Sequence, residues 1–313
     1  MQTYLVTGGC GFVGSHIVEA LIRRGDRVRV LDNFSTGNKQ NLVTVADQVD
    51  LIEGDVNDPD RVAQAVKGAD CVFHEAALAS VPRSVESPLE SHAACATGTV
   101  NVLDQARRAG VRRVVYAASS SAYGNQPHSA KRESDLPSPL SPYAAAKLAS
   151  ELYCQAFFHT YGLETVCLRY FNVFGPRQDP HGPYAAVIPL FITKLLAGER
   201  PVIYGDGKQS RDFAYVENVV HANLLAAEAP GVAGRTFNVG CGRSVSLLDL
   251  LDALNRLLGT NVNPDFRPAR TGDVRDSLAD ITQAAANLDY EPRVDLEEGL
   301  RRSIEFYRQW MRS

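Results

Sequence analysis

The chain has 313 residues, of which 45% are hydrophobic and 22% charged, a composition that excludes a disordered or fibrous protein. The formal net charge is −4 and no block of like charge stands out, which argues against a nucleic-acid partner, because proteins that neutralise phosphates carry a basic excess. A single hydrophobic core stops growing at roughly 250–300 residues, so we expect two lobes.

The cysteines and the N-terminal sequence indicate the cellular compartment. The six cysteines are widely spaced without a C-x-x-C pair, as in proteins with reduced thiols. The N-terminal MQTYLVTGG shows no secretory signal, and no apolar run approaches the roughly 18 residues of a membrane span. No H-E-x-x-H motif is present, so a metal site has no support. We expect a cytoplasmic protein that binds no membrane.

The first half alternates β-branched runs with helical patterns. Strands are predicted at residues 3–7, 27–31, 49–53, 70–74, 112–119 and 164–171. Helices are predicted at residues 12–24, 61–66, 90–109 and 141–161. This alternation indicates βαβ units and therefore an α/β fold with a doubly wound, Rossmann-type parallel sheet.

The pattern changes after residue 171, where a loop rich in glycine and proline begins. Further helices are predicted at residues 185–197, 216–229, 247–258 and 296–312, and strands at 201–204 and 236–240. We expect residues 1–171 to form the Rossmann domain. Residues 172–313 should form mainly a smaller, interleaved α/β lobe, with segments that return to the first domain.

A glycine-rich segment, TGGCGFVGSH, joins the first strand to the first helix. Glycines 9, 11 and 14 fit G-x-G-x-x-G, and glycines 8, 11 and 14 give a second regular spacing. Glycine permits positive φ and lets backbone N–H groups approach a pyrophosphate at the positive end of a helix. A glycine turn that binds nothing is the alternative, but the strand–loop–helix context favours dinucleotide binding.

The ends of the second and third strands carry acidic residues. Asp32 lies 18 positions after Gly14, where a carboxylate accepts hydrogen bonds from ribose hydroxyls and repels a 2′-phosphate. No arginine occurs in the following NFSTGN, so NAD is favoured over NADP. Asp55 and Val56 follow the third strand and are suited to contact adenine.

Tyr143 and Lys147 lie four positions apart on a predicted helix and so face the same way. We expect the ammonium to lower the phenol pKa from its usual value of about 10, which would make Tyr143 a usable base. Tyr204 and Lys208 have the same spacing, but YGDGK contains two glycines and cannot keep a helical face.

Ser119, Ser120 and Ser121 follow the predicted strand at 112–119. Ligands of open α/β sheets bind beyond the carboxyl ends of the strands, so a serine here could relay a proton between a substrate and Tyr143. The alternative is a serine-rich turn that satisfies its own backbone.

Together, TGGxGxxG, DNFSTGN, GDVND, SSSAYG, SPYAAAK and RYFNVFGPRQ resemble the extended short-chain dehydrogenases/reductases that modify nucleotide sugars. The resemblance spans essentially the whole chain. Within that family the chain is similar to NAD-dependent UDP-sugar 4-epimerases, and HEAALASVPRSVESP resembles the branch that acts on N-acetylated UDP-hexoses. The resemblance implies NAD as cofactor, a UDP-hexose as substrate, a 4-keto intermediate, and a homodimer formed through the helices near 90–109 and 141–161.

The resemblance also implies the site residues. The catalytic residues would be Ser119, Tyr143 and Lys147. The residues expected to bind NAD are Gly8, Gly11, Phe12, Val13, Gly14, Asp32, Asn33, Ser35, Gly37, Asp55, Val56, Ala76, Ala77, Tyr143, Lys147 and Tyr170. The residues expected to bind substrate are Ser80, Ser119, Ser120, Ser121, Asn172, Val187, Val202, Tyr204, Arg211, Arg270, Asp273 and Ser277.

Among the substrate residues, Arg211 and Arg270 match the family's pyrophosphate clamps, because a planar guanidinium binds phosphate bidentately. Asp273 would take ribose hydroxyls, Asn172 a diphosphate oxygen, and Val202 with Tyr204 would flank the uracil.

Ser277 matches the position that gates the sugar pocket in the family. A tyrosine there restricts the pocket to simple hexoses, so serine predicts room for UDP-GlcNAc and UDP-GalNAc alongside UDP-Glc and UDP-Gal. The preferred pair stays open.

Two other functions are the alternatives. In nucleotide-sugar 4,6-dehydratases the resemblance would place Asp and Glu where this chain has Ser120 and Ser121, and decarboxylating relatives carry a Glu near Ser121. Elimination therefore lacks its carboxylates here. A non-enzymatic NAD-binding sensor is the other alternative, but it would not be expected to keep serine, tyrosine and lysine together.

Cys95 departs from the family pattern, in which this helix segment usually begins with Asn. A thiol cannot supply the paired donor and acceptor of an amide. A helix-kink water or a sugar contact is therefore either lost or rebuilt by another residue.

Overall fold

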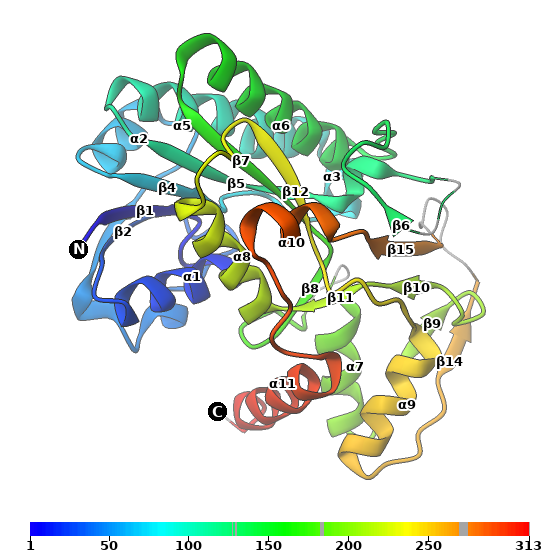
Figure 1. The fold of residues 1–313 in the computed structure, drawn as a ribbon. Helices are drawn as coiled ribbons and strands as arrows, with labels where there is room; N and C mark the ends of the chain where they lie inside the picture. Colours follow the sequence, from blue (N-terminus) through cyan, green and yellow to red (C-terminus); the bar gives the residue numbers. More distant parts are fainter. Residues whose placement is uncertain (127, 129, 182–184, 269–274, 313) are drawn as a thin grey trace.

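The centre of the molecule is a parallel sheet of seven strands (Figure 1). The computed structural model describes residues 1–126, 128, 130–181, 185–268 and 275–312. In spatial order the strands are β12 (Arg235–Val239), β7 (Glu164–Tyr170), β5 (Arg113–Ser119), β4 (Cys71–His74), β1 (Thr3–Thr7), β2 (Arg27–Asp32) and β3 (Val49–Glu53). Every neighbouring pair is parallel. The predicted Rossmann-type α/β fold is therefore confirmed, with its topological switch between β1 and β4.

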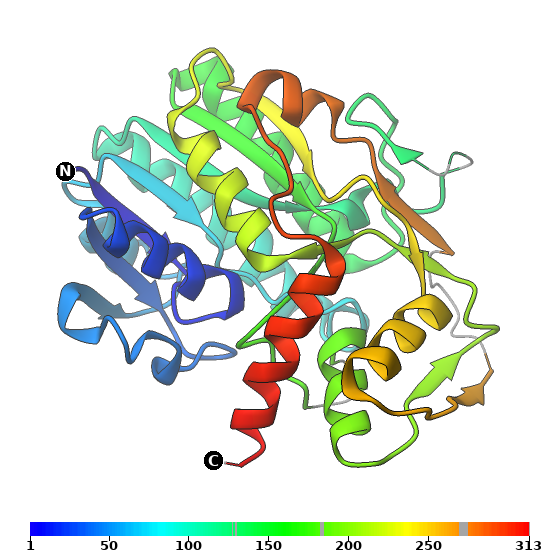
Figure 2. The same cartoon turned by 60° about the horizontal axis from the view of Figure 1, so that its bottom comes forward.

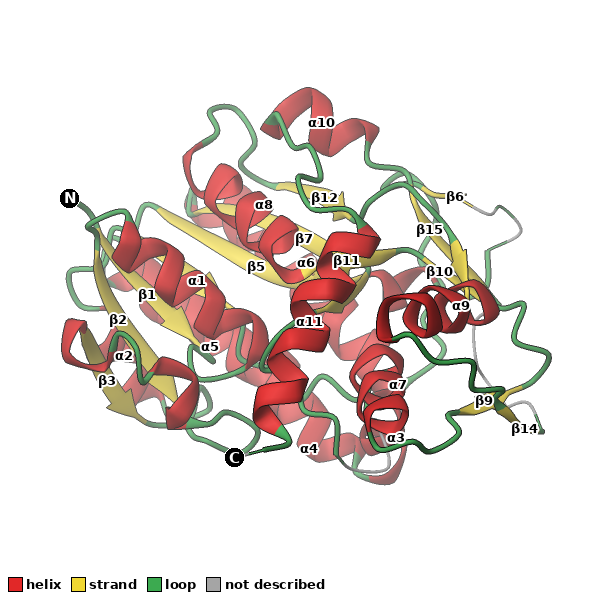
Figure 3. Ribbon diagram, turned by 90° about the horizontal axis from the view of Figure 1, so that it is seen from below, coloured by secondary structure: helices red, strands yellow, loops and turns green. Residues whose placement is uncertain are grey.

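Helices cover both faces of this sheet (Figures 1 and 3). One face packs against α2 (Pro59–Val66), α5 (Gly98–Arg108) and α6 (Pro142–Tyr161). The other packs against α1 (Phe12–Arg23), α8 (Val216–Glu228) and α10 (Thr282–Leu288). The first six residues of β5 are buried, as expected of a central strand covered on both sides.

Local sequence fixes where α6 begins. Ser141 caps the helix by accepting a hydrogen bond from the Ala144 backbone N–H, and Pro142 occupies the first helical position. The helix ends at Gly162, which has a left-handed φ of 72°. These signals place Tyr143 in the first turn and Lys147 one turn later, at the end of the helix that meets the carboxyl edge of the sheet.

The second half builds a separate hydrophobic core around three helices that lie together in the lower part of Figure 2. Its helices are α7 (Val187–Leu196), α9 (Leu247–Leu258) and α11 (Leu296–Trp310). Short strands surround them in two parallel pairs, β8 (Asn172–Phe174) with β11 (Phe213–Tyr215) and β9 (Val202–Tyr204) with β14 (Asp265–Arg267). A small sheet has the order β13 (Val245–Ser246), β10 (Ser210–Arg211), β15 (Asp276–Ala279) and β6 (Ala130–Lys131). Strand β12 leaves this half to join the large sheet beside β7.

The helix expected at 90–109 is not regular. Helix α3 (Val81–Glu86) precedes α4 (Pro88–His92), and a π-helical turn (Ala93–Thr97) then leads into α5. At this turn the Cys95 carbonyl accepts hydrogen bonds from Thr99 Oγ1 at 2.5 Å and Ser150 Oγ at 2.7 Å. Side-chain hydroxyls that enter the helical ladder are a known cause of such irregularity. They satisfy the carbonyl without an amide side chain at position 95.

No helix in the described ranges is both long enough and apolar enough to cross a membrane.

Candidate functional site

The glycine loop between β1 and α1 has no room for side chains at three of its glycines, Gly8, Gly9 and Gly14. A Cβ on Gly8, whose φ is +67°, would lie 2.8 Å from the Ala76 backbone. A Cβ on Gly14 would lie 2.2 Å from the Gly8 carbonyl oxygen. Gly11 is the N-cap of α1 and leaves its N-terminus without a side-chain cap, with Phe12 and Val13 opening the helix. A Cβ on Gly9 would lie 2.7 Å from the Val30 side chain, so both glycine spacings have a steric basis. The loop suits a pyrophosphate at this helix end.

Asp32 closes this loop from the end of β2. Its side chain is only 6% exposed and accepts hydrogen bonds from the backbone N–H groups of Cys10 at 2.9 Å and Phe34 at 2.8 Å. Burial raises the pKa of Asp32, and these hydrogen bonds oppose the rise. A Cβ on Gly37 would come within 2.8 Å of Asp32 Oδ1, so the chain passes close over the carboxylate. A carboxylate can accept more than two hydrogen bonds, so Asp32 fits ribose hydroxyls as well.

The loops after β2 and β3 are tied together at the same edge. Asn33 Nδ2 donates to Asp55 Oδ2 at 2.7 Å, and Asn33 Oδ1 accepts from the Ser35 N–H at 3.0 Å. Burial raises the pKa of Asp55, but hydrogen bonds from Asn57 and Asn33 outweigh this and hold it below its usual value. Val56 is buried under α5. The residues predicted to contact the adenine part of NAD are thus held in place by hydrogen bonds and packing within the protein.

The three predicted catalytic residues meet at the carboxyl end of β5. Ser119 ends the strand, and its Oγ lies 2.8 Å from Ser121 Oγ. The Ser119 side chain also faces the Tyr143 phenol and lowers the pKa of that phenol. Lys147 is buried and donates from Nζ to the Ala117 carbonyl oxygen at 2.8 Å. Two side chains of α6 therefore contact the end of β5: the Lys147 ammonium contacts Ala117, and the Tyr143 phenol contacts Ser119.

The pKa of Tyr143 differs from the expectation. Burial raises it well above its usual value, the charges of Cys95 and Glu75 raise it further, and the hydrogen bond with Ser119 lowers it. The prediction of a lowered pKa is wrong for the protein alone, because desolvation of the phenolate dominates. Burial also lowers the pKa of Lys147, although Cys95 and Glu75 oppose this.

The serines of the 119–121 segment also serve the backbone. Ser119 Oγ accepts a hydrogen bond from the Ser121 N–H at 3.2 Å and caps the short helix Ser120–Tyr123. A serine that satisfies the backbone of its own turn can therefore also serve as a proton relay, since the Ser119 side chain also contacts Tyr143.

Ala77 and Tyr170 flank the catalytic group. Ala77 and Tyr143 pack against Cys95 and its neighbours. Tyr170 ends β7 level with Ser119 and donates to Glu75 Oε1 at 2.8 Å. Sequence reasoning missed Glu75, although a carboxylate directly after a buried strand is the signal that identified Asp32.

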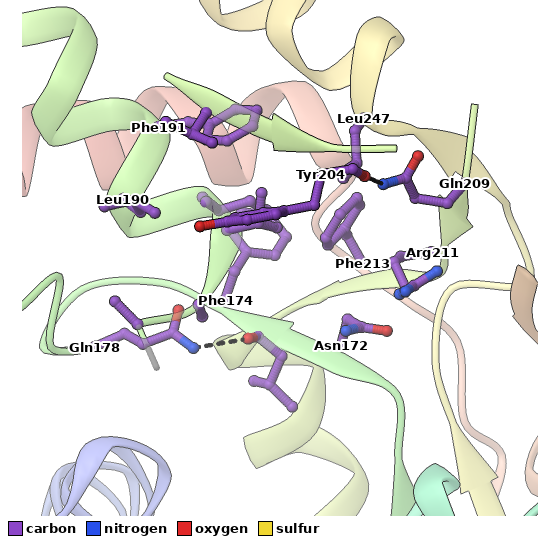
Figure 4. A pocket seen from close by; sticks show the side chains of 16 residues that line it. Asn172, Phe174, Gln178, Leu190, Phe191, Tyr204, Gln209, Arg211, Phe213 and Leu247 are labelled. Atoms are coloured by element: carbon purple, nitrogen blue, oxygen red, sulfur yellow. Dashed lines mark hydrogen bonds between the residues drawn. The ribbon is translucent and has the colours of Figure 1, made fainter. Parts of the chain in front are cut away.

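A cavity of about 270 Å³ lies in the second half of the chain (Figure 4). Five residues predicted to bind substrate line it, namely Asn172, Val187, Val202, Tyr204 and Arg211. In Figure 4 the rings of Tyr204, Phe174 and Phe213 gather in the cavity, with Arg211 and Asn172 together at one side. Apolar walls with a few convergent polar groups are typical of small-molecule sites. The aromatic residues Phe174, Phe191 and Phe213 were not predicted.

Arg211 is held by the backbone around it. Its Nη1 donates to the carbonyl oxygens of Ser210 at 2.8 Å and Arg275 at 2.9 Å. Ser277 lies beside it, because Arg211 and Ser277 are partners across β10 and β15.

Ser119, Ser120, Ser121, Ser277 and Ser80 are not among the residues that line the cavity. Ser80 caps α3 by accepting a hydrogen bond from the Arg83 N–H at 3.2 Å. Arg270 and Asp273 lie outside the described residues.

Comparison with known proteins identifies the family. Residues 4–240 match the "NAD dependent epimerase/dehydratase family". The UDP-glucose 4-epimerase of Mycolicibacterium smegmatis is 40% identical over 309 residues, covering 97% of this chain and 98% of the relative.

Solved structures are similar over the whole fold. The UDP-N-acetylglucosamine 4-epimerase of Methanobrevibacter ruminantium, in complex with UDP-N-acetylmuramic acid, has a TM-score of 0.95, 41% identity and 99% coverage of both chains. The UDP-glucose 4-epimerase of Thermus thermophilus, in complex with NAD, has a TM-score of 0.89, 36% identity and covers 98% of this chain and 99% of its own. With its glycine loop, its Ser119–Tyr143–Lys147 group and these relatives, the chain belongs to the NAD-dependent epimerase/dehydratase family.

Proposed function

We propose that this chain is an NAD-dependent enzyme that inverts C4 of a UDP-hexose through a 4-keto intermediate. The observation that carries the proposal is the meeting of Ser119, Tyr143 and Lys147 at the carboxyl end of β5. Full-length relatives named UDP-glucose and UDP-N-acetylglucosamine 4-epimerases support the reaction and the substrate class.

The glycine loop and Asp32 are the residues that would hold NAD. Tight packing at Gly8 and Gly14 brings the N-terminus of α1 against the loop, and Asp32 offers a carboxylate at the ribose position. When bound, NAD supplies the oxidant that removes hydrogen from C4 and the reductant that restores it on the opposite face.

Tyr143 would move the proton. Its phenol oxygen takes the proton of the sugar 4-hydroxyl, directly or through Ser119 Oγ, and returns it at the end of the cycle. Burial raises the pKa of Tyr143, so the phenolate needs positive charge beside it. Lys147, held by the Ala117 carbonyl, supplies one such charge from the same helix face.

The cavity in the second half would hold the nucleotide. Arg211 would bind the diphosphate and Asn172 one of its oxygens, while Val187, Val202 and Tyr204 would enclose the uracil. We propose the same clamp and ribose roles for Arg270 and Asp273, on the resemblance alone. Because only the nucleotide would be anchored here, the keto sugar would be able to turn its other face before the proton returns.

We propose that both acetylated and simple UDP-hexoses enter the pocket. The support is the small side chain of Ser277, which lies level with Arg211 on the neighbouring strand.

We also propose a division of labour along the chain. Residues 1–171 would bind NAD and residues 172–313 mainly the nucleotide sugar, with β12 and α8 returning to the large sheet.

A homodimer is a further part of the proposal. The interface would be formed by the helices expected near 90–109 and 141–161, mainly α5 and α6. Helices α3 and α4 pack beside α6 and would extend it, because α3, α4 and α6 carry exposed apolar side chains that include Val85, Leu89, Leu152 and Tyr153. Leu89 is 83% exposed and Leu152 is 55% exposed. A second copy would cover this patch. Sedimentation of the purified chain tests this, and a monomer at micromolar concentration would contradict it.

We propose a cytoplasmic location, because all six cysteines are free thiols and five of them are buried. Free thiols are typical of proteins in reducing compartments.

The function is tested by assaying the purified protein with UDP-GlcNAc and UDP-Glc in parallel, with and without added NAD. Conversion of either to its C4 epimer is expected. Failure with both would contradict the proposal, and a stable keto product would favour a 4,6-dehydratase.

The same assay tests the pocket gate. Ser277→Tyr should lower the UDP-GlcNAc rate at least about tenfold and leave the UDP-Glc rate within about twofold, because the ring fills the volume of the acetyl group. Ser277→Ala is the matched control and should keep both rates. An unchanged ratio in the tyrosine variant would contradict the gate.

A further inference from the structure

The segment of residues 175–178 connects the two halves of the molecule. It follows β8 and ends the RYFNVFGPRQ motif, in which the proposed function gives Arg177 no role. The backbone of Arg177 has a φ of +69°, a region that residues with a Cβ rarely adopt. Such a conformation persists where the surroundings hold it, so the contacts of the Arg177 side chain deserve a closer description.

The guanidinium of Arg177 reaches α1, the helix whose N-terminus would face the NAD pyrophosphate. Its Nη2 donates to Glu19 Oε1 at 2.5 Å and its Nη1 to Ser15 Oγ at 3.2 Å. One residue earlier, the Pro176 carbonyl oxygen accepts a hydrogen bond from His16 Nε2 at 3.0 Å. Ser15, His16 and Glu19 lie on one face of α1, because they are three or four positions apart. The 175–178 segment is therefore attached to this face of α1 through both its backbone and a side chain.

The ion pair between Arg177 and Glu19 is largely withdrawn from solvent, since the two side chains are 17% and 16% exposed. Burial acts to raise the pKa of Glu19, but hydrogen bonds from Thr44 and Arg177 outweigh it and hold this pKa below its usual value. Glu19 is therefore a carboxylate at neutral pH. Hydrogen bonds between two charged groups are the strong ones, and removing one partner leaves the other charge poorly solvated. The pair is a firm attachment between the two halves.

The other side of the segment forms part of the wall of the substrate cavity. Gln178 lines the cavity, and its Nε2 donates to the Val173 carbonyl oxygen at 3.1 Å (Figure 4). The Tyr307 hydroxyl on α11 donates to the Gln178 carbonyl oxygen at 2.5 Å. Gln178 directly follows Arg177, so a change in the backbone at Arg177 would move this part of the cavity wall.

We propose that Arg177 is a positioning residue for the substrate cavity, and that its ion pair with Glu19 clamps the 175–178 segment to α1 in the position that binds the nucleotide. The inference rests on the proposed function, in which this cavity holds the UDP part of the substrate. Glu19 is not among the residues that line the cavity. The clamp nevertheless makes the affinity for UDP depend on Glu19, a residue of the first half of the chain.

The test is the dissociation constant of UDP, measured by calorimetry on protein that carries NAD. The variants are Arg177→Gln, Glu19→Gln and the two combined. Each single change should weaken UDP binding about five- to tenfold, and the double variant should bind no more weakly than the single ones, because all three release the same clamp. Arg177→Lys keeps a positive charge within reach of Glu19 and should restore most of the affinity.

The matched control is Glu228→Gln. This change breaks the ion pair of Glu228 on α8 with Arg24, the residue that follows α1, and does not touch the 175–178 segment. It also removes one carboxylate near α1, as Glu19→Gln does. The dissociation constant of UDP should stay within about twofold of the wild type, because the pair is exposed and contributes little.

A merely structural role predicts a different result. The Arg177 and Glu19 variants would then have a lower Tm, but the folded protein would bind UDP as tightly as the wild type does. That outcome overturns the inference, and so does a double variant whose loss of affinity is the product of the two single losses. A wild-type protein that binds no UDP overturns the proposed function itself, so the two failures are distinguishable.

Discussion

The glycine loop and the substrate cavity are built on opposite principles. In the loop, backbone contacts backbone, and a single added Cβ at Gly14 would lie 2.2 Å from a carbonyl oxygen. In the cavity, side chains from several short strands and helices enclose about 270 Å³ of space. The first region therefore tolerates almost no change in its own atoms. The second can change its lining residues, and with them its ligand, while the fold stays the same.

The largest effect is expected at Tyr143, in the catalytic group that lies outside both regions. Tyr143→Phe removes the proton carrier, so kcat should fall about 10³-fold or more, at the strong end of general acid–base effects. The variant should still bind NAD and keep its Tm within a few degrees, because the phenyl ring can keep its packing against the cluster of Cys95, Ala96 and Ala146. Single-turnover rates and NAD content measure this. A rate near that of the wild type would remove Tyr143 from the mechanism.

The next effect tests the rigidity of the loop. Gly14→Ala should destabilise the protein by about 1–3 kcal/mol and release NAD, because the methyl group forces α1 away from Gly8. Gly68→Ala is the matched control, since its φ is +71° but the space around it is open. That change should cost about 1–2 kcal/mol from backbone strain alone and leave NAD bound. Denaturant unfolding and NAD content separate the two variants, and equal NAD retention would contradict the contrast between the regions.

The smallest of the three effects belongs to the cavity. Arg211→Lys keeps the charge but loses the planar fork, so KM for the UDP-sugar should rise about tenfold with kcat, NAD content and Tm little changed. Arg256→Lys, an exposed position on α9, is the control. Initial-rate kinetics give both constants. If KM does not change, the diphosphate is not bound through Arg211.

The same contrast explains what could be predicted from the sequence. The loop, Asp32 and the Tyr143–Lys147 pair are encoded within short stretches, so spacing and strand ends were enough to find them. Phe174 and Phe213 are ordinary apolar residues until β8 and β11 pair and turn their rings into the cavity. The full set of cavity residues therefore depends on tertiary contacts that no local pattern contains.

Two further differences have physical causes of their own. The π-helical turn at Cys95 depends on the hydroxyl of Ser150, which is far away in sequence. The raised pKa of Tyr143 reflects the desolvation of the phenol in the fold, and sequence spacing to Lys147 carries no information on burial.

The position of β12 has a consequence for how the protein is made. This strand pairs with β7, but each of its residues lies 69 positions after its partner in β7, for example Val239 with Tyr170, so it follows most of the cavity residues in the chain. A growing chain that has emerged only as far as β7 therefore exposes the unpaired N–H and C=O groups of that strand along an open edge. Such an edge readily pairs with other chains until its own partner strand arrives. The edge of β7 is therefore covered only by a strand from the later part of the chain. A fragment that ends at Tyr170 would expose this edge and would be prone to aggregate.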